Sequence, residues 1–339
     1  MNTQHARQLS RRRFLSRLTL AGTAGLLGLP RRSVAAEPPP ETPRLKVVQL
    51  SSICTAPNHV AEELLKAEGF AEVEYLQKTG GLVSKTLGAG EADIALNFAG
   101  PLVISVDSGN PIVILAGIHS GCFQLVGTQR VQTIRDLKGK TVNVIVLGGI
   151  QHVFLASMVA YVGLDPRSDI TWGTHPAAEQ VPLLQEGKID AFVAFPPLVQ
   201  ELRAKQIGHV VVDSTSDRPW SQYFCCMVEA NRDFIRQYPV ATKRALRALL
   251  KAANLCALEP ERVAQQLVDK GLAKDFGYAL QAMKELPYDT WHSYNPEDTV
   301  RFYALRLHEV GMIKSSPQKI IAQGTDWRFF NALKKELKG

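Results

Sequence analysis

The chain has 339 residues, a formal net charge of +7 and five cysteines. The first 36 residues hold seven arginines and no Asp or Glu, so the remaining chain has a formal charge of zero. This balance removes the main electrostatic argument for nucleic-acid binding. Five irregularly spaced cysteines in so long a chain do not predict a disulfide scaffold, and we expect mostly free, buried thiols.

The N-terminal segment is typical of a twin-arginine export signal. Residues 10–15 read S-R-R-R-F-L, a weakly apolar run follows at 18–29, and small residues end at Ala35 and Ala36. The run is about a dozen residues long, whereas a membrane-spanning helix needs roughly 20. We therefore predict that residues 1–36 are a cleaved signal peptide, cut after Ala36 or Ala35, and that the protein is periplasmic.

The first part of the remaining chain alternates strand-like and helical patterns. Residues 37–44 are rich in proline and predict an extended linker. Apolar runs at 45–50, 73–76, 92–98 and 111–118 predict strands, with helical patterns between them. This alternation favours a mostly parallel sheet with helices on both faces.

A second alternation follows residues 133–140. It predicts strands at 141–146, 170–172, 191–194 and 209–212, and helices at 152–162 and 177–185. After an apolar strand at 221–228, helices are predicted at 239–257, 260–268 and 296–310. We expect two α/β lobes: lobe 1 from residues 45–128 and 218–339, and lobe 2 from residues 129–217. Two crossing segments would join them as a hinge.

Several short motifs carry a family resemblance. Residues 133–142 read T-I-R-D-L-K-G-K-T-V, residues 187–191 read G-K-I-D-A, and residues 311–313 read G-M-I. In this order they resemble the periplasmic binding proteins of the SsuA/THI5-like, or NMT1, group, over essentially the whole chain after the signal. The group includes receptors for nitrate, taurine, alkanesulfonates and thiamine-type pyrimidines.

The resemblance implies a type II periplasmic-binding-protein fold whose two lobes close on a small solute. Such a receptor presents its solute to the membrane permease of an ABC importer. The chain has no Gly-x-x-x-x-Gly-Lys-Ser/Thr loop of its own, so the ATPase would be a separate subunit. We expect a monomer without enzymatic activity, cofactor or metal, and without a nucleic-acid partner.

The ligand is expected beyond the carboxyl ends of the strands, where loops enter helices. The candidate ligand-binding residues are Thr55, Asn58, Asn97, Phe98 and His119 in lobe 1, Gly148, Gly149, Gln151, His152, Phe195 and Pro196 in lobe 2, and Trp220 and Tyr223 between the lobes.

Each candidate also has an ordinary structural explanation. Gly148 and Gly149 would allow a ligand to approach the backbone, but paired glycines are also a common turn device. The aromatic rings could stack on a planar solute, but such side chains are more often core. No clear arginine clamp is present, Arg218 being the nearest candidate, so the charge of the solute stays open.

The cysteines raise a metal or redox alternative. Cys225 and Cys226 are adjacent, and neighbours on a strand point to opposite faces, so we do not expect them to share a metal. If the crossing strands pair, Cys122 could approach Cys225 or Cys226 and form a disulfide. Two rival functions also stay open: a THI5-like pyrimidine synthase, which poorly explains an export signal, and a periplasmic sensory adaptor.

Overall fold

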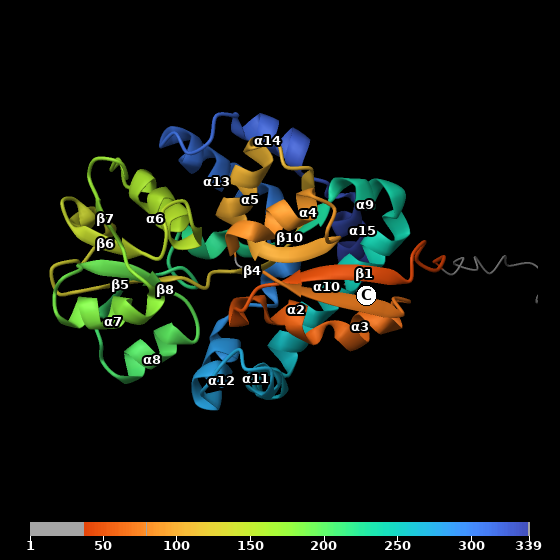
Figure 1. Ribbon diagram of the computed structural model, residues 1–339, viewed down its shortest axis with the longest axis horizontal. Coiled ribbons are helices and arrows are strands. Elements are labelled where there is room, and N and C mark those ends of the chain that lie inside the picture. Colours follow the sequence, from red (N-terminus) through yellow and green to blue (C-terminus); the bar gives the residue numbers. More distant parts are fainter. Residues whose placement is uncertain (1–36, 79, 338–339) are drawn as a thin grey trace, which may run out of the picture. The chain divides into compact units, whose positions relative to one another are not determined.

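The computed structural model describes residues 37–78 and 80–337, and from Pro39 onward they belong to one compact unit. The predicted signal peptide, residues 1–36, lies outside the described part of the chain. Two five-stranded sheets and the helices around them make up this unit (Figure 1). In the described part, no helix has the length and apolar character needed to cross a membrane.

The first sheet has the strand order β2-β1-β3-β10-β4. Its strands are β1 (Arg44–Gln49), β2 (Glu72–Gln77), β3 (Ile94–Phe98), β4 (Ile112–Ser120) and β10 (Phe224–Asn231). β3, β4 and β10 are buried along their whole length, because helices cover both faces of the sheet. Their continuous apolar runs are typical of strands that do not face water.

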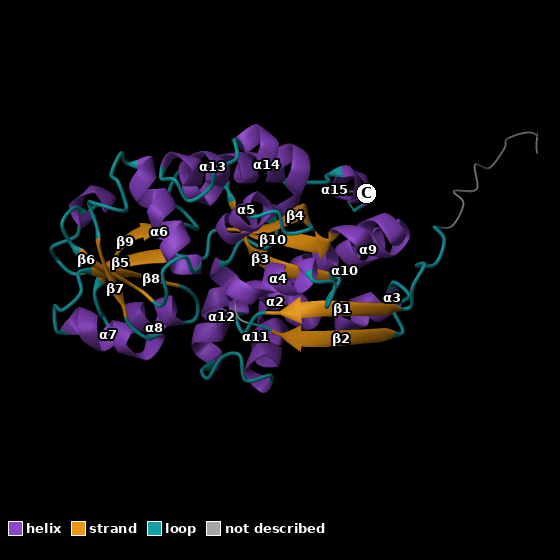
Figure 2. Cartoon of the chain, turned by 45° about the horizontal axis from the view of Figure 1, so that its top comes forward, coloured by secondary structure: helices purple, strands orange, loops and turns teal. Residues whose placement is uncertain are grey.

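The helices of the first lobe come from both ends of the chain, and Figure 2 shows them around the β1–β4 and β10 sheet. The first group is α2 (Ala56–Val60), α3 (Glu62–Ala67), α4 (Val83–Gly88) and α5 (Ala99–Asp107). The second group is α9 (Arg232–Gln237), α10 (Pro239–Leu258), α11 (Pro260–Asp269), α12 (Phe276–Glu285), α13 (Pro296–Glu309), α14 (Pro317–Gly324) and α15 (Arg328–Glu336).

The second sheet has the order β7-β6-β8-β5-β9. Its strands are β5 (Gln124–Gly127), β6 (Thr141–Val144), β7 (Thr171–Thr174), β8 (Ala191–Ala194) and β9 (His209–Asp213). Its helices are α6 (Ile150–Tyr161), α7 (Ala177–Gln185) and α8 (Leu198–Ala204). The predicted two-lobed α/β fold is confirmed.

Each sheet is mostly parallel, as expected, but contains one antiparallel strand that the sequence did not predict. β10 is antiparallel to β3 and β4, and β5 is antiparallel to β8 and β9. β5 and β10 are the strands that follow the two crossings between the sheets, so each enters its sheet directly from the other lobe. The predicted start of lobe 2, at residue 129, lies too late in the chain, because β5 already belongs to the second sheet. Only residues 121–123 separate it from β4, so the apolar pattern shows no break there.

The two crossing segments, residues 121–123 and 214–223, contact one another. Gly121 has a φ of +54°, and a Cβ atom there would lie 2.4 Å from the Ser214 carbonyl oxygen. Glycine is therefore required at this position for both backbone conformation and space. The Ser214 hydroxyl accepts hydrogen bonds from the N–H groups of Cys122 (3.1 Å) and Phe123 (2.9 Å). The two crossing segments are therefore hydrogen-bonded to each other and are not independent linkers.

The predicted linker is fixed at one point. The Glu41 carboxylate accepts hydrogen bonds from the N–H groups of Val240 (2.9 Å) and Ala241 (2.8 Å), at the start of α10. These are donors that a helix leaves unpaired at its N-terminus. The last residue assigned to the linker, Arg44, is already the first residue of β1.

Candidate functional site

The second sheet's helix α6 contacts α5 and α13 of the first lobe. On another side of the crossings, α8 lies against α12, where Gln200 Nε2 donates to Glu285 Oε2 (2.9 Å) and Arg203 pairs with the same carboxylate. The two lobes therefore contact each other through the crossing segments and through helices on either side of them. These contacts describe the closed arrangement of the two lobes.

A small cavity lies between the two lobes. Its free volume is about 10 Å³, about the room that one water molecule needs. It is lined by Phe98, Ala99, Gly100, Pro101, Phe123, Ile150, Phe154, Cys225 and Tyr303. The walls come from the start of α5, the first turns of α6, the first crossing, β10 and α13. No lining residue is charged, and the lining is largely aromatic.

Four phenylalanine rings extend from one lobe to the other. The ring of Phe123, in the first crossing, is 5.3 Å from the ring of Phe98 at the end of β3. It is 4.6 Å from the ring of Phe154 on α6, and the Phe195 ring is 6.2 Å away. Aromatic pairs at such separations each contribute about 0.5–1.5 kcal/mol beyond their buried area. Phe123 therefore links both walls of the cavity.

The close approach of α5 and α6 depends on a glycine. Gly100 lies in the first turn of α5, and a Cβ atom built on it would be 2.8 Å from Val153 Cγ1 on α6 and 3.5 Å from the Tyr303 ring. Real Cβ atoms do not approach another carbon this closely. The side chain of Val153 is β-branched and has little rotamer freedom in a helix. Gly100 therefore sets how far the two lobes can close.

We expect Gly100→Ala to hold the lobes apart. The added methyl group would collide with Val153, so the closed arrangement loses stability while each lobe keeps its own core. Small-angle X-ray scattering should show a larger radius of gyration for Gly100→Ala than for wild type. The double variant Gly100→Ala/Val153→Ala should restore the wild-type radius, and an unchanged radius in the single variant would contradict the role assigned to Gly100.

Among the predicted ligand residues, Phe98 lines the cavity. The polar candidates of the first lobe are buried and hydrogen-bonded within it. Thr55 Oγ1 donates to the Ser52 carbonyl oxygen (2.8 Å), and Asn58 Nδ2 donates to the Val48 carbonyl oxygen (2.7 Å). Asn97 Nδ2 donates to the Glu229 carboxylate (2.9 Å), and both ring nitrogens of His119 contact carbonyl oxygens. A solute role for these four residues stays a prediction.

The candidates at the start of α6 form a closed local network. Gly148 has a φ of +76°, as a glycine turn predicts, and its N–H donates to His152 Nδ1 (3.0 Å). Gln151 Nε2 donates to the Val193 carbonyl oxygen (2.7 Å), and Gln151 Oε1 accepts from the Ile145 N–H (3.2 Å). Gly149 is half-buried and precedes the first residue of α6. Burial lowers the pKa of His152, so its ring is a neutral acceptor here.

The remaining candidates are aromatic or apolar residues around the crossings. Trp220 is buried with its ring 5.6 Å from that of Tyr161, and the ring of Tyr223 stacks on Phe302 at 4.1 Å. Neither residue lines the cavity. Phe195 is half-buried and Pro196 is buried, both directly after β8.

Of the nine residues that line the cavity, only Phe98 was a candidate, and the eight missed residues include Phe123, Phe154, Cys225 and Tyr303. Phe154 follows Ile150 by four residues on α6, so both lie on one helix face, and this spacing is a signal that could have found it. Sequence reasoning also missed an apolar loop beside the site. Ile145, Val146 and Leu147, between β6 and α6, are 43%, 58% and 54% exposed. Exposed apolar residues grouped in this way often mark a binding surface.

Two of the three motifs behind the family resemblance, residues 133–142 and 187–191, have structural roles in the second lobe. Thr133 and Asp136 form a reciprocal capping box on the short helix Ile134–Leu137. Asp190 Oδ2 accepts from the Thr141 N–H (2.9 Å), and Asp190 pairs with Arg130 (2.7 Å). These interactions hold the start of β6 against the start of β8. The motifs therefore identify the fold of the lobe, whereas they supply no residue of the cavity lining.

Comparisons with known proteins agree with this architecture. A family model described as NMT1-like family matches residues 38–268. The periplasmic nitrate-binding protein NrtA from Synechocystis PCC 6803 is structurally similar, with 16% identity, a TM-score of 0.73, and coverage of 89% of this chain and 90% of that chain. No curated protein sequence matches the chain.

Two sulfonate-binding proteins are also similar in structure. The aliphatic sulphonate binding protein SsuA from Escherichia coli has 17% identity and a TM-score of 0.66, and the match covers 85% of this chain and 94% of that one. SsuA from Xanthomonas axonopodis pv. citri, bound to MOPS, has 14% identity and a TM-score of 0.66, with coverage of 86% and 100%. At these identities the likeness shows the fold alone.

Proposed function

The chain belongs to the NMT1-like family, and on this premise we propose that it is the solute-binding component of an ABC importer. It captures a small solute between its two lobes by hinge closure and presents it to a membrane permease that works with a separate ATPase subunit. It acts in the periplasm as a monomer, after export through the twin-arginine pathway and removal of residues 1–36. It has no catalytic role.

One observation carries this proposal. Both lobes contribute walls to the same cavity. One wall is the start of α5 and the opposite wall is the start of α6, and the cavity lies next to the crossing segments. Ligands of α/β sheets bind beyond the carboxyl ends of strands, and hinge closure around such a site is a recurrent mechanism of solute capture. Proteins of the same fold described as nitrate-binding and sulphonate-binding support the same function.

The lining favours an organic solute over a bare oxyanion. No Arg, Lys or His side chain lines the cavity, whereas strong recognition of an oxyanion relies on charged donors. Phe98, Phe123 and Phe154 instead offer apolar ring surface, and the exposed residues 145–147 extend this apolar character outside the cavity. We propose a small solute with an aromatic or aliphatic part that lies against these rings. The lobes must separate to admit it, because the closed cavity holds about one water molecule.

A thermal-shift screen tests the proposal. The purified protein without residues 1–36 is mixed in turn with an aliphatic sulfonate, an aromatic carboxylate, nitrate and an aminopyrimidine. Saturation at about 100 times the dissociation constant adds about 2.7 kcal/mol to the free energy of unfolding. We expect a shift with one of the organic solutes and none with nitrate.

Two variants make this screen specific. Phe98→Ala removes a ring from the cavity and should abolish the shift, whereas Phe276→Ala removes a ring that is 39% exposed on α12 and should leave it unchanged. A shift with nitrate alone would overturn the solute class. No shift with any probe, together with bound iron or pyridoxal phosphate absorbance in the purified protein, would favour the THI5-like synthase instead.

A further inference from the structure

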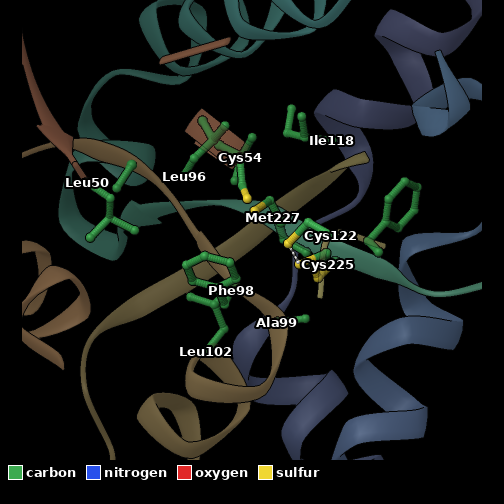
Figure 3. Packing of buried hydrophobic residues seen from close by; sticks show 14 of the residues in the cluster. Leu50, Cys54, Leu96, Phe98, Ala99, Leu102, Ile118, Cys122, Cys225 and Met227 are labelled. Atoms are coloured by element: carbon green, nitrogen blue, oxygen red, sulfur yellow. Dashed lines mark hydrogen bonds between the residues drawn. The ribbon is translucent and has the colours of Figure 1, made fainter. Parts of the chain in front are cut away.

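Four of the five cysteines form one buried cluster, and His119 interacts with two of them, Cys54 and Cys226. Cys54 lies in the short helix Ile53–Thr55 after β1, Cys122 in the first crossing, and Cys225 and Cys226 on β10. All are buried and free, as predicted. Figure 3 shows Cys54, Cys122 and Cys225 within the same apolar cluster, and the sulfur atoms of Cys122 and Cys225 are 2.7 Å apart. A disulfide needs about 2.05 Å, so bonding requires a shift of about 0.7 Å.

An irregularity in β10 brings Cys225 to this position. Phe224 is paired with Ser120 of β4 and Cys226 with His119, so Cys225 is an extra residue that opposes no residue of β4. Such a bulge bends the strand and changes the direction of its side chains. The thiols of both Cys225 and Cys226 consequently interact with that of Cys122. This corrects the expectation that adjacent cysteines would point to opposite faces.

His119 is held as a cation by its hydrogen bonds. Its Nε2 atom is 3.0 Å from the Cys54 carbonyl oxygen, and its Nδ1 atom is 3.0 Å from the Gly121 carbonyl oxygen. Carbonyl oxygens only accept, so both ring nitrogens must donate, and only the protonated ring carries both protons. Burial opposes charge on His119, but the neighbouring Cys226 outweighs it and raises the pKa of His119 to about 9.

Cys226 is the counter-charge. Burial alone would raise the pKa of its thiol, but hydrogen bonds from the thiols of Cys122 and Cys225 and the charge of His119 lower that pKa well below its usual value. Burial and the neighbouring thiols raise the pKa of Cys122. Burial likewise raises the pKa of Cys225, so the cluster holds its thiolate at Cys226 and keeps Cys122 and Cys225 as thiols that donate to it.

We propose that Cys122 and Cys225 are a reversible disulfide site, oxidised by exchange with the disulfide of a low-molecular-weight thiol. Cys225 lines the cavity, so it is the first to meet the oxidant when the lobes separate. It attacks one sulfur atom of the oxidant, which breaks the oxidant's S–S bond, and its proton leaves on the released sulfur as one thiol. Cys122 then displaces the second thiol. The pair loses two electrons and two protons, and the oxidant leaves as two thiols.

The bond would connect the two crossings. Cys122 lies in the first, and Cys225 is the second residue of the strand that follows the second. Oxidation would therefore attach residues 121–123 covalently to the start of β10, beside the cavity wall. This restriction of the hinge makes the redox state of the pair a control on opening.

The test counts thiols in the purified protein. Wild type, Cys122→Ser, Cys225→Ser and the control Cys256→Ser are incubated with excess oxidised glutathione, unfolded, and treated with an alkylating reagent. Cys256 lies on α10, and the structure assigns it no part in the pair. Wild type should keep three alkylated cysteines of its five, and Cys256→Ser should keep two of its four. Neither of the other variants should form an internal disulfide.

Peptide mapping of the wild type decides the assignment, even if a serine variant fails to fold. The expected product is a cross-link between the peptides that carry Cys122 and Cys225. Five alkylated cysteines, glutathione retained on Cys225, or a cross-link between another pair would each overturn the proposal. A second arm rests on the proposed function: a bound solute should slow oxidation, and failure of that arm alone would count against the solute site and not against the disulfide.

Discussion

Glu68→Gln is expected to lower the free energy of unfolding by about 3–5 kcal/mol, the usual cost of removing one partner of a buried ion pair. Glu68 is buried directly after α3, and its carboxylate accepts from Arg247 Nε (3.0 Å) and Nη2 (2.8 Å) on α10. Lys251 Nζ donates to the same carboxylate (2.9 Å). In the variant, the buried positive charge of Arg247 would lose the negative charge of Glu68 that now neutralises it. Urea denaturation at pH 7 measures this loss.

The sign of the pH dependence gives a second check on Glu68. Burial by itself would raise the pKa of Glu68, but the hydrogen bonds and charges of Arg247 and Lys251 lower it. A carboxylate with a lowered pKa stabilises the fold above its usual pKa, and this contribution disappears as the pH falls through the lowered value. The difference between wild type and Glu68→Gln should therefore shrink in acid. Glu62→Gln, which removes an exposed pair with Lys66, should change stability by less than about 1 kcal/mol at any pH.

Glu229→Gln is expected to stabilise the protein at alkaline pH by about 3 kcal/mol. Glu229 lies in the middle of β10 and is fully buried, and burial raises its pKa to about 7 despite hydrogen bonds from Asn97 and Ser84. Its Oε2 atom has no hydrogen-bond partner among the described residues. Ionisation therefore places a poorly compensated charge inside the first sheet.

The expected profile follows from the direction of this shift. A raised pKa in the folded state means that the wild type is most stable below the usual pKa of a glutamate and loses stability as the pH rises through about 7. Glutamine keeps the shape and the acceptor for Asn97 and Ser84 but cannot ionise. Melting temperatures of both proteins from pH 4 to pH 9 should coincide at the acid end, separate as the pH rises toward 7, and stay apart by a constant amount above it. Parallel curves would show that Glu229 does not titrate in this range.

The sequence predicted the elements of the fold well, because strand-length apolar runs and helical spacing alternate clearly. It could not place the first crossing, since β4 and β5 are separated by three residues without a break in apolar pattern. Nor could it predict the mixed strand directions. The direction of β10 depends on its entry from the second lobe, and no local property of residues 224–231 encodes this.

The site was harder to predict because position at a strand end does not reveal a side chain's partner. Asn58 and Asn97 follow the expected strands, yet their amide groups donate to Val48 and Glu229 inside the first lobe. The partner of Asn97 is more than a hundred residues away in the sequence. Phe98 was predicted and lines the cavity, whereas Cys225 became visible only through the bulge in β10.

The measurement that tests the account most directly is isothermal titration calorimetry with the organic solute that gives the largest thermal shift. Wild type should bind one solute molecule per chain. Phe98→Ala and Phe154→Ala, which remove rings from opposite walls of the cavity, should each weaken binding at least about tenfold, equivalent to about 1.4 kcal/mol. Phe276→Ala should bind like wild type. Equal affinity in all four proteins, or no binding by wild type, would contradict a solute site between the two lobes.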